Sequence, residues 1–192
     1  MPAADPSQRP RPLMLAAALI AVGSVCFGVK ASAILLTGDQ PPILFGIAGL
    51  PIGLGLLLLA RWSITRHGPA RRVTAAAALS FVAVLAAAYG ASMEILSQTI
   101  AEPFESMLAV GSGFGPMIAA LLIGLRLRAF PGNTRRIGRR ALLIAIAFIP
   151  LMVLGGIAAD LVGERYLEIG LLVVAGLWLS LAQSMWTVNE RV

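Results

Sequence analysis

The stretch "LMLAAALIAVGSVCFGVKASAILL", residues 13–36, holds a single charged side chain within a run long enough to cross a bilayer. A helix that spans the hydrocarbon core needs about 20 apolar residues. Five more runs of similar length follow, at 42–60, 73–97, 106–125, 141–159 and 167–186. None alternates with the period of two that barrel strands need. The sequence therefore predicts an all-α integral membrane protein, a bundle of six transmembrane helices.

The composition of the whole chain agrees with this fold class. Hydrophobic residues make up 58% of the 192 residues and charged residues only 12%, whereas soluble domains carry about 25% charged residues. The six runs use nearly the whole chain, so we expect one transmembrane domain at 13–186. Short tails at 1–12 and 187–192 flank this domain.

The basic residues predict the orientation of the bundle, because arginine and lysine accumulate in cytoplasmic loops. Thirteen of the fifteen basic residues fall on one side if six helices alternate in direction. The connections on the other side carry most of the acidic residues, among them Asp39, Glu102, Glu105, Asp160, Glu164 and Glu168. We expect both termini in the cytoplasm and the bundle in a bacterial-type plasma membrane.

The N-terminus has a second interpretation. Arg9, Arg11, the apolar run and the small residues "ASA" at 31–33 also match a secretory signal with its cleavage site. The apolar run continues past that site through residues 34–36, which favours an uncleaved anchor.

Small residues recur at helical spacing and predict close helix packing. They occur in three of the runs, as Gly46, Gly49 and Gly53, as Ala83, Ala87 and Ala91, and as Gly111, Gly115 and Ala119. Trp178 is predicted to pack inside the bundle. These faces could also allow helices to slide past one another.

Three prolines lie inside apolar runs, Pro51, Pro116 and Pro150, and each is expected to kink its helix. In both the second and the fifth run, glycines follow the proline. Such matched interruptions are typical of inverted repeats. A repeat of three helices plus three helices is therefore possible.

Lys30 and Glu94 are charged residues that lie well inside apolar runs. The first and third helices run in the same direction, which places both charges at a similar depth near the outer surface. One interpretation is a charge pair, or a shared cavity for a polar solute or ion. The other is snorkelling, in which the lysine stem carries its ammonium group to the headgroups.

The remaining polar side chains concentrate in the first, third and sixth runs. We expect these helices to line any polar path, while the second and fifth helices face lipid or a partner. The single Cys26 and the single His67 cannot supply a His/Cys zinc site or a bis-histidine haem. We expect no cofactor and no bound metal, and His67 is interpreted as a loop residue.

The segment "RLRAFPGNTRRIGRR", residues 126–140, is predicted to be an arginine-rich cytoplasmic loop. Anionic headgroups attract basic residues by about 1 kcal/mol each. A docking surface for a membrane or cytoplasmic protein is the alternative. Nucleic acid is not expected, since the segment has neither a series of interleaved aromatics nor a recognisable nucleic-acid-binding fold. The candidate contact residues are Arg71, Arg72, Arg135, Arg136, Arg139 and Arg140.

The functional hypothesis from sequence is a small permease or the membrane subunit of a transport system, with no cargo indicated. The alternative is a non-catalytic accessory or scaffold protein that packs against a larger membrane complex. An enzyme is not expected, because no cluster of acids, histidine or activated nucleophile is evident.

Overall fold

The computed structural model describes the backbone of residues 11–39, 44–96 and 102–188. Side chains are described within these ranges except at 44–47, 94 and 102–112. Within this part of the chain the structure is entirely helical, which confirms the predicted fold class. The elements are α1 (Arg11–Thr37), α2 (Leu44–His67), α3 (Arg71–Ile95), α4 (Glu102–Leu127), α5 (Asn133–Val162), the 3₁₀-helix η1 (Glu164–Tyr166) and α6 (Leu167–Trp186).

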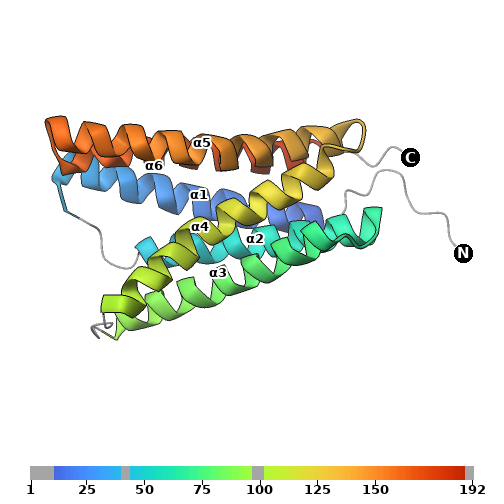
Figure 1. Ribbon diagram of the computed structural model, residues 1–192, viewed down its shortest axis with the longest axis horizontal. Coiled ribbons are helices and arrows are strands. Elements are labelled where there is room, and N and C mark those ends of the chain that lie inside the picture. Colours follow the sequence, from blue (N-terminus) through green and yellow to red (C-terminus); the bar gives the residue numbers. More distant parts are fainter. Residues whose placement is uncertain (1–10, 40–43, 97–101, 189–192) are drawn as a thin grey trace, which may run out of the picture.

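The six helices form an up-and-down bundle in which each helix packs against the next one in the chain (Figure 1). α6 returns to pack against α1, and α4 also crosses α2. We call the end where α1 begins and α6 ends the terminal end, and the end with η1 the distal end. Toward the distal end, α3 and α4 diverge from α1, α5 and α6 (Figure 1).

Within the described residues, five stretches of helix are long and apolar enough to cross a membrane: Arg11–Thr37, Ala48–His67, Arg71–Met93, Asn133–Val162 and Glu164–Trp186. The fully described part of α4, Gly113–Leu127, is apolar but shorter. Apolar side chains such as Leu36, Ile146 and Leu161 are widely exposed on the bundle surface. This surface suits contact with lipid, so the helices are compatible with a membrane protein.

The arginine-rich segment is mostly helical, which corrects the prediction of a loop. Only residues 128–132 separate α4 from α5, and α5 begins at Asn133 and runs for 30 residues. At a rise of 1.5 Å per residue it is about 45 Å long, more than the ~30 Å of a hydrocarbon core. The apolar run in the sequence marks only the part of the helix that suits lipid. The first turns of the helix are polar, but they are rich in arginine, which is a good helix former.

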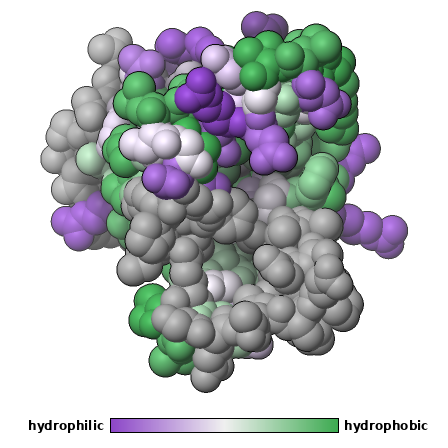
Figure 2. Space-filling model, turned by 90° about the vertical axis from the view of Figure 1, so that its left-hand side faces the viewer, coloured by the Kyte–Doolittle hydropathy of each residue, from purple (hydrophilic) through white to green (hydrophobic). Residues whose placement is uncertain are grey.

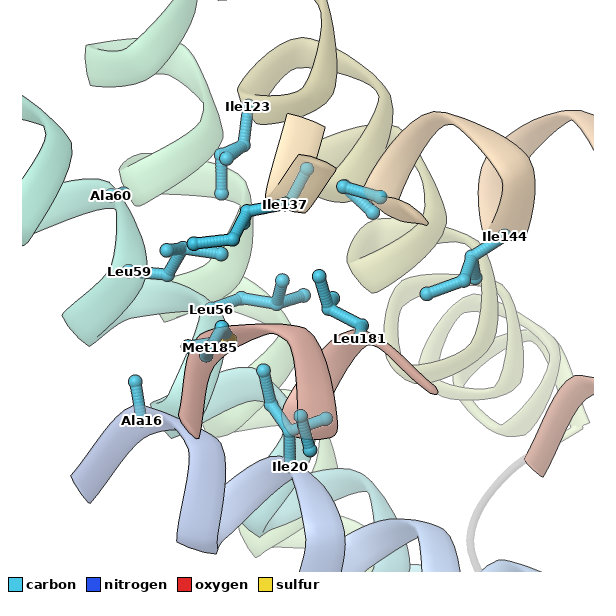
Figure 3. Packing of buried hydrophobic residues seen from close by; sticks show 14 of the residues in the cluster. Ala16, Ile20, Leu56, Leu59, Ala60, Ile123, Ile137, Ile144, Leu181 and Met185 are labelled. Carbon is cyan, nitrogen blue, oxygen red and sulfur yellow. The ribbon is translucent and has the colours of Figure 1, made fainter. Parts of the chain in front are cut away.

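The terminal half of the bundle is filled by one hydrophobic cluster to which all six helices contribute. Figure 3 shows Ile20, Leu56, Ile123 and Leu181 converging from four of these helices. Each of these side chains is fully buried. Close packing of branched side chains from every helix fixes the relative positions of the helices in this half.

Glycine lets α2 lie close to its neighbours. A Cβ atom on Gly55 would stand 2.9 Å from the carbonyl oxygen of Ala16 in α1, and one on Gly49 would stand 3.2 Å from the Cβ of Ala87 in α3. The small residues whose surroundings are described therefore form packing faces, while Gly46 and Gly111 lie outside these residues. α2 contacts α1, α3 and α4, so the expectation that α2 faces lipid or a partner is wrong. Helices that pack this closely need small residues, and in α2 these residues are apolar. The lack of polar residues in α2 had suggested a helix that faces lipid.

Candidate ligand-binding site

A cavity of about 190 Å³ lies where five of the helices meet. Every side chain around it is apolar among the residues whose side chains the structure describes. The lining residues are Phe27 of α1, Gly49 and Ile52 of α2, Gly113, Pro116 and Met117 of α4, Phe148 and Met152 of α5, and Leu171, Val174 and Trp178 of α6. An apolar cavity of about 150 Å³ in another protein binds benzene. The space here therefore suits an apolar group of similar or slightly larger size.

Glycines and aromatic rings together shape this cavity. A Cβ atom on Gly113 would have no heavy atom within 4 Å, so the absence of a side chain at this position leaves open space. Trp178 is 2% exposed and Phe148 is 8% exposed. The ring of Phe148 packs edge-on against Phe114, with 5.3 Å between ring centroids. The cavity walls thus include large aromatic side chains that are themselves held by packing.

Two charged side chains are buried in the described part of the molecule, Lys30 of α1 and Glu168 in the first turn of α6. Lys30 is 4% exposed and Glu168 is 8% exposed. The Lys30 ammonium group interacts electrostatically with the Glu168 carboxylate. Burying either charge alone is costly, so the pairing offsets part of the desolvation.

The charge pair lies next to the cavity on its distal side. Lys30 follows the lining residue Phe27 by three positions, and Glu168 precedes the lining residue Leu171 by three positions. Residues three apart are neighbours on one helix face, and three residues advance about 4.5 Å along the axis. α1 and α6 run in opposite directions and pack together. Both charges therefore lie about one turn beyond the same end of the apolar cavity.

Glu168 keeps an unused hydrogen-bond acceptor. Its Oε2 atom is buried and has no hydrogen-bond partner among the described residues. The buried Ser24 and Ser80, in contrast, donate to backbone carbonyls of their own helices, over 2.6 Å to Ile20 and 2.8 Å to Ala76. A buried acceptor without a donor costs about 1–3 kcal/mol, more when it is charged. A ligand that supplies the donor would recover this free energy.

The sequence identified Lys30 but not Glu168, which was assigned to a distal connection. The side chain of Glu94 lies outside the described residues, so its pairing with Lys30 stays a prediction. Glu168 begins a stripe of buried or cavity-lining positions on α6 at intervals of three or four, continuing through Leu171, Val174, Trp178, Leu181 and Met185. This periodicity could have indicated that the Glu168 side chain faces the interior of the bundle, since residues at this spacing lie on one face of a helix.

The three prolines lie inside α2, α4 and α5, as predicted. Pro116 is buried and lines the cavity, whereas Pro150 is exposed. The prediction of Trp178 inside the bundle is confirmed. The kinks and the inverted repeat stay predictions.

The candidate contact arginines lie toward the terminal end, at the start of α3 and in the first turns of α5. All are exposed except the partly exposed Arg140, so they remain accessible to headgroups or a partner. The exposed residues are Arg71, Arg72, Arg135, Arg136 and Arg139.

His67 is the last residue of α2, which corrects its assignment to a loop. Its ring stacks on Phe130, with 3.9 Å between centroids, and meets Trp62 edge-on at 5.7 Å. The Arg126 guanidinium donates to the His67 carbonyl oxygen over 2.9 Å and lies over Phe130. These contacts join α2 to the end of α4. The sequence could not show the contacts between the two segments, because Trp62 and His67 are far along the chain from Arg126 and Phe130.

The described residues contain no group of three or more His, Cys, Asp or Glu side chains that could hold a metal ion. No family model matches the sequence, and neither a curated protein nor a solved structure shows significant similarity to it. The cavity and the two buried charges next to it are therefore the features of the molecule that bear on its function.

Proposed function

We propose that the protein is a small permease, or the membrane subunit of a transport system, whose solute binds in the cavity beside Lys30 and Glu168. The supporting observation is the combination of an apolar cavity with a buried charge pair at one end of it. Ionisable residues inside a membrane bundle are costly and commonly mark a solute or ion pathway. Residues of α1, α2, α4, α5 and α6 all line the cavity, so a ligand there would contact five of the helices.

A solute needs a carrier to cross the membrane when it has a polar or charged group. Wholly apolar molecules enter hydrocarbon unaided, whereas a buried charge without compensation is strongly disfavoured. The site contains both a compartment for an apolar group and opposite charges within one helical turn of it. A solute with an apolar part and a polar part therefore fits the arrangement.

The test is purification in mild detergent, identification of every retained protein by mass spectrometry, and reconstitution of the same preparation into liposomes. Uptake of a mixture of small amphipathic amines, carboxylates and zwitterions is measured for the native protein and two variants. Gly113→Leu fills the cavity. Gly156→Leu is the matched control, because Gly156 also has no heavy atom near its Cβ position but does not line the cavity.

We expect at least one solute to enter vesicles containing the native protein or the control variant faster than it enters empty liposomes. Gly113→Leu should abolish the difference. Uptake equal to that of empty liposomes for all three folded proteins would overturn the proposal. A stoichiometric membrane partner together with no uptake would instead support an accessory or scaffold role.

A further inference from the structure

Four arginines lie within the first eight residues of α5, at Arg135, Arg136, Arg139 and Arg140. The first three are exposed and Arg140 is partly exposed. Like charges four residues apart repel each other along a helix and destabilise it, as in the pairs Arg135–Arg139 and Arg136–Arg140. Among the side chains that the structure describes, none at the terminal end is acidic. An anion that binds from outside the chain would therefore offset this repulsion.

The position of these arginines along α5 corresponds to the headgroup layer of a bilayer. The apolar part of α5, residues 141–159, is about 28 Å long at 1.5 Å per residue, close to the ~30 Å of a hydrocarbon core. The headgroups add about 5–8 Å on each side. Arg139 and Arg140 directly precede the apolar part, so they fall in this layer. Arg135 and Arg136 lie one turn further out, and their long side chains can reach back to it.

The face of α5 that carries arginines continues as an aliphatic face. Exposed positions recur at intervals of three or four from Arg136 onward, and residues at this spacing lie on one face of a helix. We call this set the α5 stripe. It consists of Arg136, Arg139, Leu143, Ile146, Pro150, Val153, Ile157 and Leu161. One helix face is thus positively charged at the level of the headgroups and aliphatic at the level of the hydrocarbon.

We propose that the α5 stripe binds an anionic phospholipid from the leaflet at the terminal end. The lipid phosphate pairs with Arg136 and Arg139, because the planar guanidinium group matches phosphate oxygens with two parallel hydrogen bonds. One leaflet contributes about 15 Å of the hydrocarbon core, so the acyl chains cover the stripe from Leu143 to about Pro150. Any phospholipid can cover the aliphatic part, and the arginines select a headgroup with a net negative charge.

Competition between two lipids in detergent tests this proposal. The purified protein is mixed with equal amounts of dioleoylphosphatidylglycerol and dioleoylphosphatidylcholine, which have the same acyl chains and differ in the net charge of the headgroup. Native mass spectrometry counts the molecules of each lipid that stay bound. We expect the native protein to retain phosphatidylglycerol preferentially. An attraction of about 1 kcal/mol per basic residue corresponds to about fivefold in affinity, so Arg139→Gln should lower the preference about fivefold. Arg139→Lys keeps the charge and should retain most of it.

Arg61→Gln is the matched control. It also removes one exposed arginine near the terminal end, but from α2, which does not contact α5 within the described residues. It should leave the preference nearly unchanged. Equal retention of the two lipids by the native protein would overturn the proposal, as would equal losses in Arg61→Gln and Arg139→Gln. Displacement of phosphatidylglycerol by millimolar inorganic phosphate would instead indicate a site for free anions. An acidic protein that copurifies through Arg136 and Arg139, without any lipid preference, would replace the lipid by a protein partner.

Discussion

The two halves of the bundle are built differently, although the same six helices pass through both. The terminal half is filled by a continuous cluster of buried side chains, including Leu56, Ile123 and Leu181 (Figure 3). This cluster reaches the wall of the cavity at Phe148 and Trp178. Toward the distal half lie the cavity and the buried Lys30–Glu168 pair. Dense packing favours one arrangement of the helices, whereas a cavity and a buried charge reduce stability. We therefore expect the terminal half to be the more rigid one, and our proposal assigns ligand binding to the other half.

The surface of the distal end also differs from that of a purely lipid-facing bundle. Figure 2 shows hydrophilic and hydrophobic side chains together at this end, with the hydrophilic ones gathered in its upper part. Asp160, Glu164 and Arg165 are exposed around the junction of α5 and η1. Water and charged solutes are thus compatible with the end of the molecule nearest to the charge pair.

The largest effect should come from breaking the charge pair. Lys30→Met leaves the Glu168 carboxylate buried without its cationic neighbour, and such changes cost about 3–5 kcal/mol. Glu168→Gln should be similarly costly. The double variant should recover most of the loss, because no buried charge then remains among the residues whose side chains are described. Unfolding in detergent, followed by circular dichroism, measures all three.

A double variant as unstable as the sum of the two single variants would contradict this coupling. The two residues would then contribute independently to the free energy of unfolding. The distal half would no longer differ from the terminal half by containing a coupled pair of buried charges. Lys30→Arg is a useful control, since it keeps the positive charge on a different head group.

The second effect compares the packing of the halves directly. Ile123→Ala creates a new void in the dense cluster and should cost about 2–5 kcal/mol. Met152→Ala only enlarges a space that exists, and a side chain facing a void has fewer contacts to lose. We expect it to cost less than half as much. Equal losses in the same unfolding measurement would show that the two halves are packed alike.

The helical fold followed from the sequence because hydrocarbon requires internally satisfied backbones, and runs of apolar residues report this requirement directly. The packing role of small residues such as Gly49 and Ala87 was also evident, because their spacing is a local pattern. The cavity was not predictable, since it arises where side chains from five helices fail to fill space. The burial of Glu168 was not predicted because an acidic residue at the start of a helix is usually exposed to water. Glu168 is buried because α6 packs against α1, and the sequence does not show this packing.

The smallest effect concerns two glycines that look alike in the sequence. At Gly55 a Cβ atom would meet the side chain of Ile20 at 2.6 Å and a backbone oxygen of α1 at 2.9 Å, so Gly55→Ala should cost about 1–3 kcal/mol through overpacking. At Gly113 the same change meets open space. Because alanine is the better helix former by about 0.5–1 kcal/mol, Gly113→Ala should be neutral or slightly stabilising.

If the two substitutions change the free energy of unfolding in opposite directions, the two halves differ in whether they can accept one added methyl group. The dense half has no room for one more carbon at Gly55, while the cavity has room for several at Gly113. A bound ligand should shrink this difference, since it occupies the space into which a side chain at Gly113 would grow. Gly113→Ala measured with and without a saturating solute from the uptake assay therefore tests whether the ligand occupies the space beside Trp178.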